Sequence, residues 1–210
     1  MAFVHRGATL RPTKPEIVGQ WLAAAGWFDA DAETDRTAPP LSYRFDDPAG
    51  KVGIEALVVP YEDRYIQLPL TYREAPLEGA EGWLLTTMEH SALGRRWVYD
   101  GVGDPVLITA FVNSILGGTS SAVLEFDADD ERRTASTSVH ARGTGSGPIP
   151  TPLDVVAVER TGSVSTVQTT AGTLRIPHLL DPAAPASSAS LVGDGDALGS
   201  TVLLAGFVPG

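Results

Sequence analysis

Two neighbouring stretches of the chain bring together side-chain types that bind or transform small molecules. Met88-Glu89-His90 offers a carboxylate and an imidazole, and residues 95–100 add guanidinium groups, two aromatic rings and a second carboxylate. General acid–base catalysis needs such titratable groups at one place, and sugar recognition needs aromatic faces beside hydrogen-bonding groups. If the chain is an enzyme, its best catalytic candidates are therefore Glu89, His90 and Asp100.

Alternation along a β-strand decides which of these side chains face together. Arg95, Trp97 and Tyr99 fall on one face of their strand, and Trp83 and Glu89 share a face of the partner strand. The rings either stack against a sugar or form a cross-strand aromatic ladder with a salt bridge at its rim. The ladder is favoured because aromatic residues on strands usually pack in a core. The predicted ligand or partner surface comprises Glu89, His90, Arg95, Trp97, Tyr99 and Asp100.

Other motifs lack the residues that their chemistry requires. The four histidines, at positions 5, 90, 140 and 178, have no metal-ligand spacing and are expected to be isolated at the surface or at sheet edges. A calcium loop starting at Asp127 would need glycine and glutamate where Arg132 and Ser138 stand, so a solvated turn is predicted. The glycine-rich residues 143–147 precede prolines, not a helix, and indicate a linker. We expect no metal and no cofactor.

Composition narrows the class of protein. The chain has 210 residues, a formal net charge of −11 and ordinary hydrophobic content, which predicts a soluble globular protein. The negative field disfavours nucleic acid and membrane surfaces as partners. There is no cysteine and no long apolar segment, and the first residues lack a secretory signal, so a cytoplasmic location is expected. Lys14 and Lys51 are the only lysines, which argues against a Walker-type phosphate loop in later residues.

Two helices are expected to hold the first half together. Thr13 and Glu16 form a capping box ahead of an apolar stripe that ends at Gly26. A second helix should begin after Asp104 as its N-cap and run to Leu116, with apolar side chains around most of its circumference. Such a helix must be deeply buried.

Strand patterns surround these helices. Residues 42–46, 52–59, 65–72, 83–90 and 95–99 alternate and are separated by turn-like residues, with a four-residue hairpin connection between the last two strands. The second half predicts shorter strands at residues 123–126, 135–140, 153–159, 163–169, 174–176 and 201–207, and a mobile loop over residues 181–196. The predicted class is α+β: a curved antiparallel sheet on a buried helix in residues 1–125, followed by a smaller β-rich segment in residues 126–210.

The first half resembles the N-terminal cap domain of bacterial maltokinases. The resemblance lies in residues 43–55, in Leu68-Pro69-Leu70-Thr71-Tyr72-Arg73 and in residues 88–105, and it covers most of residues 1–125. It implies a cap fold similar to cystatins, with a curved antiparallel sheet around a helix. In those kinases the cap supplies no known catalytic residue, so the resemblance implies no active site here.

The second half is similar to the next kinase segment, in which a hairpin precedes the strand that carries the ATP-anchoring lysine. That alignment places the hairpin at residues 158–170 and Arg175 where the kinase has its lysine. A catalytic lobe with its base and metal-binding aspartates would not fit before Gly210, so no kinase activity is expected. The leading hypothesis is a non-catalytic accessory protein of α-glucan or maltose metabolism, with a protein or saccharide partner. The alternatives are a sugar- or nucleotide-binding module and, third, an enzyme of another type.

Overall fold

The computed structural model describes residues 2–3, 5, 7–27, 39–128, 131–182 and 189–210. Its centre is a curved antiparallel sheet in the spatial order β2, β6, β7, β5, β4 and β3, and a short strand, β14, also pairs with β5. The strands are β2 Leu10–Arg11, β3 Leu41–Phe45, β4 Val52–Tyr61, β5 Arg64–Arg73, β6 Leu84–His90, β7 Gly94–Asp100 and β14 Leu179–Leu180. The antiparallel sheet predicted within residues 1–125 is confirmed.

The first helix, α1 (Lys14–Ala25), has the ends that the sequence predicts. The backbone N–H of Thr13 donates to Glu16 Oε2 at 2.7 Å, which completes the capping box. Gly26 ends the helix with a φ of 70°, the left-handed conformation that glycine adopts without strain.

The second helix, α2 (Pro105–Gly117), is buried as its sequence predicts. Asp104 caps it by accepting a 3.0 Å hydrogen bond from the backbone N–H of Val106. Phe111 has no exposed surface, and apolar residues before and after it are equally buried. The helix therefore serves as the centre of the core.

Both faces of the central sheet are covered. Along β4, Ile54, Ala56 and Val58 belong to the hydrophobic cluster that contains α2. The intervening Leu57 and Val59 belong to the cluster that contains α1. Because successive strand residues point to opposite faces, the two helices lie on opposite sides of the sheet. This arrangement explains why β4 is apolar along most of its length instead of alternating with polar residues.

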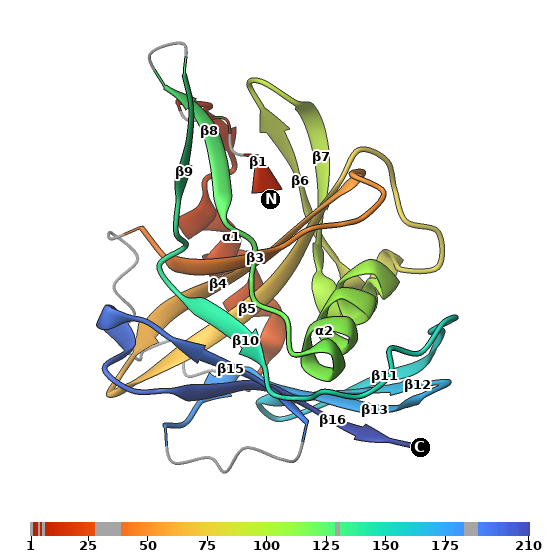
Figure 1. Ribbon diagram of the computed structural model, residues 1–210. Helices are drawn as coiled ribbons and strands as arrows, with labels where there is room; N and C mark the ends of the chain where they lie inside the picture. Colours follow the sequence, from red (N-terminus) through yellow and green to blue (C-terminus); the bar gives the residue numbers. More distant parts are fainter. Residues whose placement is uncertain (1, 4, 6, 28–38, 129–130, 183–188) are drawn as a thin grey trace.

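A second antiparallel sheet packs on the other side of α2, which lies between the two sheets (Figure 1). Its strands, in spatial order, are β10 His140–Gly143, β15 Ser190–Asp194, β16 Val202–Pro209, β13 Gly172–Pro177, β12 Val164–Thr169 and β11 Val155–Thr161. Leu174, Ile176 and Phe207 share one hydrophobic cluster with α2. The α+β class is confirmed, and the division of the chain after residue 125 stays a prediction.

Short elements complete the described residues. Strands β1 (Ala2–Phe3), β8 (Leu124–Ala128) and β9 (Glu131–Ala135) form a small third sheet, in which β1 runs parallel to β8. Where the sequence predicts a solvated turn, Asp127 and Ala128 end β8 and Glu131 begins β9, and residues 129–130 lie outside the described residues. Three single-turn 3₁₀ helices are η1 Glu81–Trp83, η2 Gly101–Gly103 and η3 Asp196–Leu198.

Two predictions for the second half are wrong in their local structure. Residues 136–139 interrupt the strand predicted at 135–140, because Ser138 Oγ accepts from the backbone of Ser42 and Thr137 Oγ1 donates to the carbonyl of Val139. Such local side-chain bonds compete with strand pairing. The loop predicted at residues 181–196 contains β15, which lies between β10 and β16 inside its sheet, and residues 183–188 lie outside the described part.

The glycine-rich residues 143–147 are a packed segment, not a linker. The backbone N–H groups of Gly145 and Gly147 donate to the carbonyls of Ile115 and Leu116 at 2.8 and 2.9 Å, so they satisfy the free carbonyls at the end of α2. A Cβ on Gly143 would lie 1.8 Å from the carbonyl oxygen of Ser114. A Cβ on Gly145 would lie 2.6 Å from the carbonyl oxygen of Ile115, so Gly143 and Gly145 are both required for the close backbone approach.

Candidate functional site

The tip of the β6–β7 hairpin carries three of the predicted site residues. Glu89 lies directly opposite Arg95 in the strand register, and Glu89 Oε1 is 2.8 Å from Arg95 Nε. Both side chains are more than 60% exposed. His90 Nδ1 accepts hydrogen bonds from the backbone N–H groups of Ala92 and Leu93 at 3.1 and 3.2 Å, which shapes the turn. Partial burial, with help from His5 and Arg96, lowers the pKa of His90.

The other end of β7 lies in the interior. Tyr99 is only 2% exposed, and its hydroxyl accepts a 2.8 Å hydrogen bond from the backbone N–H of Leu77. Trp97 is partly buried and stands opposite Thr87 and Arg73. The structure thus brings Glu89, His90 and Arg95 together at the tip and separates them from Tyr99 and Asp100. Their role as a ligand or partner surface stays a prediction.

Asp100 anchors a buried polar network that the sequence pattern did not predict. Asp100 Oδ2 accepts a 2.7 Å hydrogen bond from the indole of Trp21 and a short one from Arg160. The Arg160 guanidinium also lies 5.3 Å from the ring centroid of Trp21 and 5.6 Å from that of Trp83, within cation–π range. One carboxylate therefore joins α1, β7 and β11, residues that are distant in the sequence.

Beside this network, Ser165 and His178 form a hydrogen-bonded pair similar in type to the serine–histidine pair of hydrolases. Ser165 Oγ is 2.8 Å from His178 Nε2, and His178 Nδ1 is 3.1 Å from the carbonyl oxygen of Gln67. Because a carbonyl only accepts, Nδ1 carries the proton and Nε2 accepts from the serine hydroxyl. The expectation that all histidines lie at the surface or at sheet edges is wrong for His178, which has no exposed surface.

Burial determines the chemistry of this pair. Desolvation lowers the pKa of His178 to about 4, with Asp100 acting in the opposite direction and Arg160 in the same direction. The ring therefore stays neutral near pH 7. Ser165 is also fully buried, so a substrate has no access to its hydroxyl. The pair is an internal cross-link between the two main sheets and not an active site.

A second buried charge, Glu55, lies on the α1 side of the central sheet. Its Oε1 is 2.8 Å from Lys14 Nζ and 3.0 Å from Arg44 Nε, and its Oε2 accepts a 3.1 Å hydrogen bond from the hydroxyl of Tyr72. Desolvation raises the pKa of Glu55, but the two cations outweigh it and hold the value at about 2. These contacts tie the start of α1 to the sheet.

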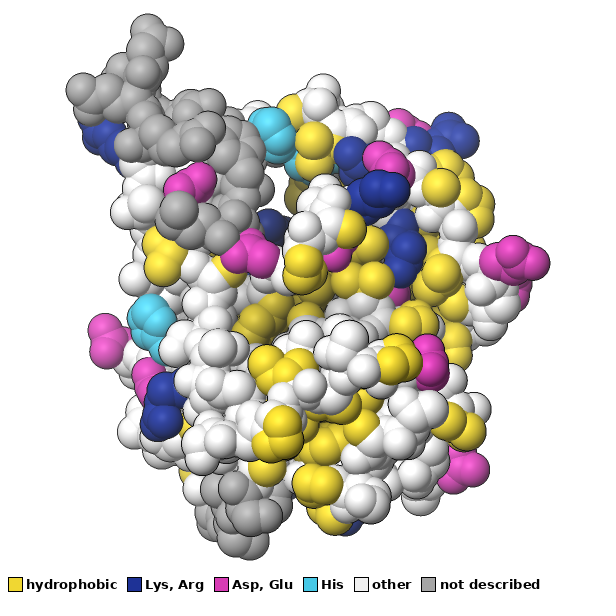
Figure 2. Space-filling view, turned by 45° about the vertical axis from the view of Figure 1, so that its right-hand side comes forward, with side chains coloured by type: hydrophobic (Ala, Val, Ile, Leu, Met, Phe, Trp, Pro, Cys, Tyr) yellow, Lys and Arg dark blue, Asp and Glu magenta, His cyan; other side chains and the backbone are white. Residues whose placement is uncertain are grey.

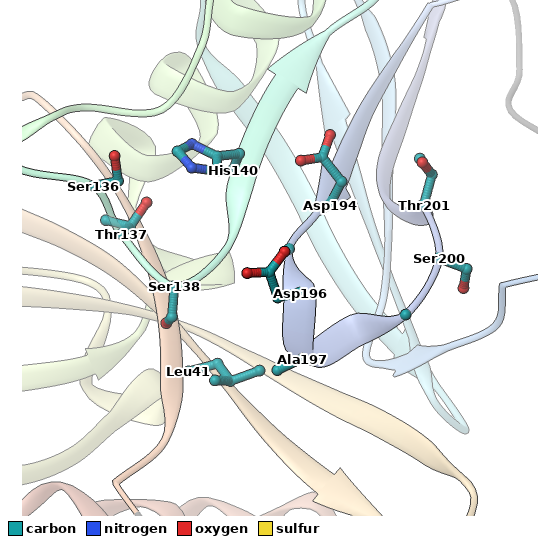
Figure 3. Close-up of a pocket in the computed structure, with 12 residues that line it drawn as sticks. Leu41, Ser136, Thr137, Ser138, His140, Asp194, Asp196, Ala197, Ser200 and Thr201 are labelled. Atoms are coloured by element: carbon teal, nitrogen blue, oxygen red, sulfur yellow. The ribbon is translucent and has the colours of Figure 1, made fainter.

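An open pocket lies at the edge of the second sheet, where residues 136–138, β10, β15 and η3 meet (Figure 3). Its volume is about 830 Å³. His140 and Asp194 are directly paired across β10 and β15, so their side chains emerge on the same face. Asp196 follows on η3, and its carboxylate points into the space below Asp194. The pocket is therefore assembled by strand pairing and not by a sequence motif.

The wall that carries Asp196 is firmly held. Leu198 is 7% exposed and anchors η3 in the core, and the hydroxyl of Tyr65 donates to the carbonyl of Ala197. A Cβ on Gly195 would lie 2.5 Å from the carbonyl oxygen of Ser138, so the two walls of the pocket meet closely there. The polar side chains thus project from a rigid frame.

The polar groups of the pocket are free to bind. Within the described residues, six lining side chains have no hydrogen-bond or ion-pair partner: Ser136, His140, Asp194, Asp196, Ser200 and Thr201. Leu41 is the only large apolar residue in the described lining. The pocket offers carboxylates, hydroxyls and an imidazole, which makes it an acceptor-rich site.

A smaller pocket of about 420 Å³ lies between one face of α2 and the β3–β4 turn. Its walls include Phe45, Pro48, Val106 and Ala110, and it is less polar than the first pocket. Asn113 Oδ1, also on its wall, is buried without a hydrogen-bond partner among the described residues. In Figure 2, charged side chains and a histidine lie near the top of the molecule, above a hollow that contains hydrophobic side chains.

The sequence prediction missed the larger pocket because its residues carry no spacing signal. His140 was expected to be an isolated edge histidine, and it does lie exposed on the edge strand β10. The two aspartates fall in the stretch expected to be a loop. Strand β15, Ser190–Asp194, carries no alternation of apolar and polar residues that would mark it as a strand.

The first half of the chain forms a curved antiparallel sheet packed on a buried helix, and comparison with known proteins identifies the domain family that it resembles. Residues 21–104 match the family model of the maltokinase N-terminal cap domain. The resemblance found in the sequence is confirmed over these residues. They include the C-terminal end of α1, residues 21–25, and strands β3–β7, and they end at Asp104, the N-cap of α2.

The match leaves the pocket almost entirely outside the cap domain, since Leu41 is its only lining residue within residues 21–104. No curated protein matches the chain. Within the described residues, no helix is long and apolar enough to cross a membrane.

Proposed function

We propose that the chain is a non-catalytic accessory or regulatory protein, related to the cap of maltokinases, that works in α-glucan or maltose metabolism. The observation that carries the proposal is the match of residues 21–104 to the maltokinase cap. The cap model describes a domain that accompanies an enzyme, and a related domain here fits an accessory role. The proposed setting is the cytosol, in keeping with a chain that has no cysteine.

The use of the buried polar groups supports the non-catalytic part of the proposal. Asp100 is engaged by Trp21 and Arg160, and His178 bonds both Ser165 and Gln67. Asp104 caps α2 and pairs with Arg73 at 2.6 Å. These groups connect elements of the fold, and groups committed to structural contacts are not available to transfer protons or phosphoryl groups.

The strand aligned with the kinase ATP site also supports this proposal. Arg175 takes the position of the ATP-anchoring lysine in that alignment, and it is exposed on β13. A guanidinium does not replace a lysine ammonium at a site that depends on a compact point charge.

An assay of sugar phosphorylation tests the non-catalytic role. Purified protein incubated with ATP, Mg²⁺ and maltose or glucosamine should form no more sugar phosphate than a blank without protein. Arg175→Ala and, as an exposed-arginine control, Arg142→Ala should behave like the wild type. Sugar phosphate that follows the protein through purification and disappears only in Arg175→Ala would contradict the proposal.

The structure favours one alternative, a small-molecule binding module, through the open pocket beside η3. That pocket is large enough for a small ligand, and its free polar side chains are the kind that fix a ligand's orientation. Binding and an accessory role are compatible, since a regulatory protein can carry a ligand site.

A further inference from the structure

We propose that the pocket formed by residues 136–138, β10, β15 and η3 binds a small organic cation with two or more ammonium groups, a linear polyamine. The proposal identifies the ligand class of the binding module and does not depend on the role in glucan metabolism. It rests on the composition of the pocket wall, the free state of its side chains and the placement of its two carboxylates.

Charge selects the ligand. The described lining contains the carboxylates of Asp194 and Asp196 and no lysine or arginine. Neither aspartate has an ion-pair partner within the described residues, and both are exposed to solvent. The whole chain carries a net charge of −11, so the surrounding field also attracts cations. An anionic ligand would meet no compensating charge in this wall.

Hydrogen bonding favours ammonium groups in particular. A primary ammonium group donates three hydrogen bonds and a secondary one donates two, and neither accepts any. The pocket offers the matching acceptors, since the hydroxyls of Ser136, Ser200 and Thr201 and the imidazole of His140 accompany the carboxylates. A charged donor and a charged acceptor form the stronger class of hydrogen bond.

The spacing of the acidic groups favours an organic cation over a metal ion. Among the described residues, no three histidine, aspartate or glutamate side chains come close enough to hold one metal ion. The carboxylates instead follow one another along the wall, from the end of β15 to η3 (Figure 3). Ammonium groups separated by methylene chains can reach carboxylates that a single ion cannot bridge.

The pocket wall disfavours a ligand that binds by ring stacking. Sugar and base rings are commonly held against aromatic side chains. The described lining contains no phenylalanine, tyrosine or tryptophan, and its one large apolar residue is Leu41. A flexible chain of methylene groups needs no aromatic platform and can pass over Leu41.

Isothermal titration calorimetry with spermidine tests the proposal directly. The wild type should bind spermidine saturably, and the affinity should fall as sodium chloride is raised because the contacts are charged and open to solvent. The double variant Asp194→Asn/Asp196→Asn, which changes only exposed side chains, should bind at least tenfold more weakly. The matched control is Asp154→Asn/Glu159→Gln, which removes the same charge at the opposite edge of the same sheet.

The control separates a site from general attraction to an acidic protein. Wild-type affinity in the control variant, together with loss in Asp194→Asn/Asp196→Asn, supports the pocket. Equal weakening in both double variants, or no weakening in either, would overturn it, as would an absence of saturable heat with the wild type. None of these results bears on sugar phosphorylation, so failure here leaves the accessory role standing.

Discussion

Acidification should destabilise this protein well above the pH at which its carboxylates are protonated, and His178 is the reason. In the folded state, burial lowers the pKa of His178 from 6.5 to about 4. Between pH 6.5 and pH 4, the imidazole of His178 is mostly protonated in the unfolded chain and mostly neutral in the folded chain. The contribution of His178 to the free energy of unfolding is therefore fully present above the unfolded-state pKa, and it is lost as the pH drops from about 6.5 towards about 4.

The size of the effect follows from the two pKa values. At pH 5 most unfolded chains carry a protonated imidazole and most folded ones do not, so the free energy of unfolding should be about 2 kcal/mol lower than at pH 7. Glu55 contributes little in this range, because its pKa is lowered from 4.5 to about 2 and its stabilising effect is lost only below about pH 4.5. The pKa of His90 shifts in the same direction as that of His178, but His90 is only partly buried, so its effect is small.

Urea unfolding at pH 7, 6 and 5 measures this dependence. His178→Gln should be less stable at pH 7 and should lose most of the pH dependence, whereas His140→Gln, at an exposed site, should keep it. In the wild type, NMR signals of the His178 ring should also remain those of a neutral imidazole at pH 5. Equal wild-type stability at pH 7 and 5, or an unchanged slope in His178→Gln, would refute the reasoning.

Three further predictions address the core, the glycine segment and the hairpin. Phe111→Ala should lower the free energy of unfolding by about 3–5 kcal/mol, measured by urea denaturation, because a fully buried aromatic ring is lost; a loss under about 1 kcal/mol would place the ring at the surface. Gly143→Ala should cost about 1–3 kcal/mol by forcing α2 away, whereas Gly147→Ala, where a Cβ meets nothing within 4 Å, should be close to neutral; similar thermal unfolding of the two variants would contradict this. If the β6–β7 hairpin binds sugar, maltose and maltooligosaccharides should quench tryptophan fluorescence saturably in the wild type and not in Trp97→Ala. No response in the wild type, together with a folded Trp97→Ala variant that loses a partner captured by the wild type, would assign the hairpin with its exposed Glu89–Arg95 pair to protein contact instead.

The first half of the fold could be predicted because local and long-range signals agree there. Asp104 and the prolyl residue after it specify the start of α2, and the apolar residues around its circumference specify burial. The hairpin at residues 91–94 likewise sets the register that places Glu89 opposite Arg95. At these positions the interacting residues are close together in the sequence, and each pattern is compatible with one structure.

The second half required information that the sequence pattern does not contain. A glycine-rich segment that contains Gly143 and Gly145 is equally compatible with a flexible linker and with a close backbone contact. The contact is recognised only once the carbonyls at the end of α2 are known to lie beside these glycines. Strand β15 is short, and apolar and polar residues do not alternate along it. The sequence therefore predicts a linker for the first segment and a loop for the second.

The buried network and the pocket could not be predicted either, because the fold brings their residues together from distant parts of the sequence. Trp21, Asp100, Arg160 and His178 meet in one buried network although they are spread over most of the chain. No spacing rule connects them. In the pocket, His140 and Asp194 become neighbours only through the pairing of β10 with β15. Predicting either set would have required the topology of the second sheet.

The accessory role in glucan metabolism is tested most directly by measuring maltose and α-glucan in source-organism cells that lack the gene. The account predicts an altered level of at least one of them, restored by the wild-type gene and equally by the Arg175→Ala variant, since no catalysis is involved. Unchanged maltose and α-glucan in the deletion strain, or restoration by the wild type that fails with Arg175→Ala, would contradict it.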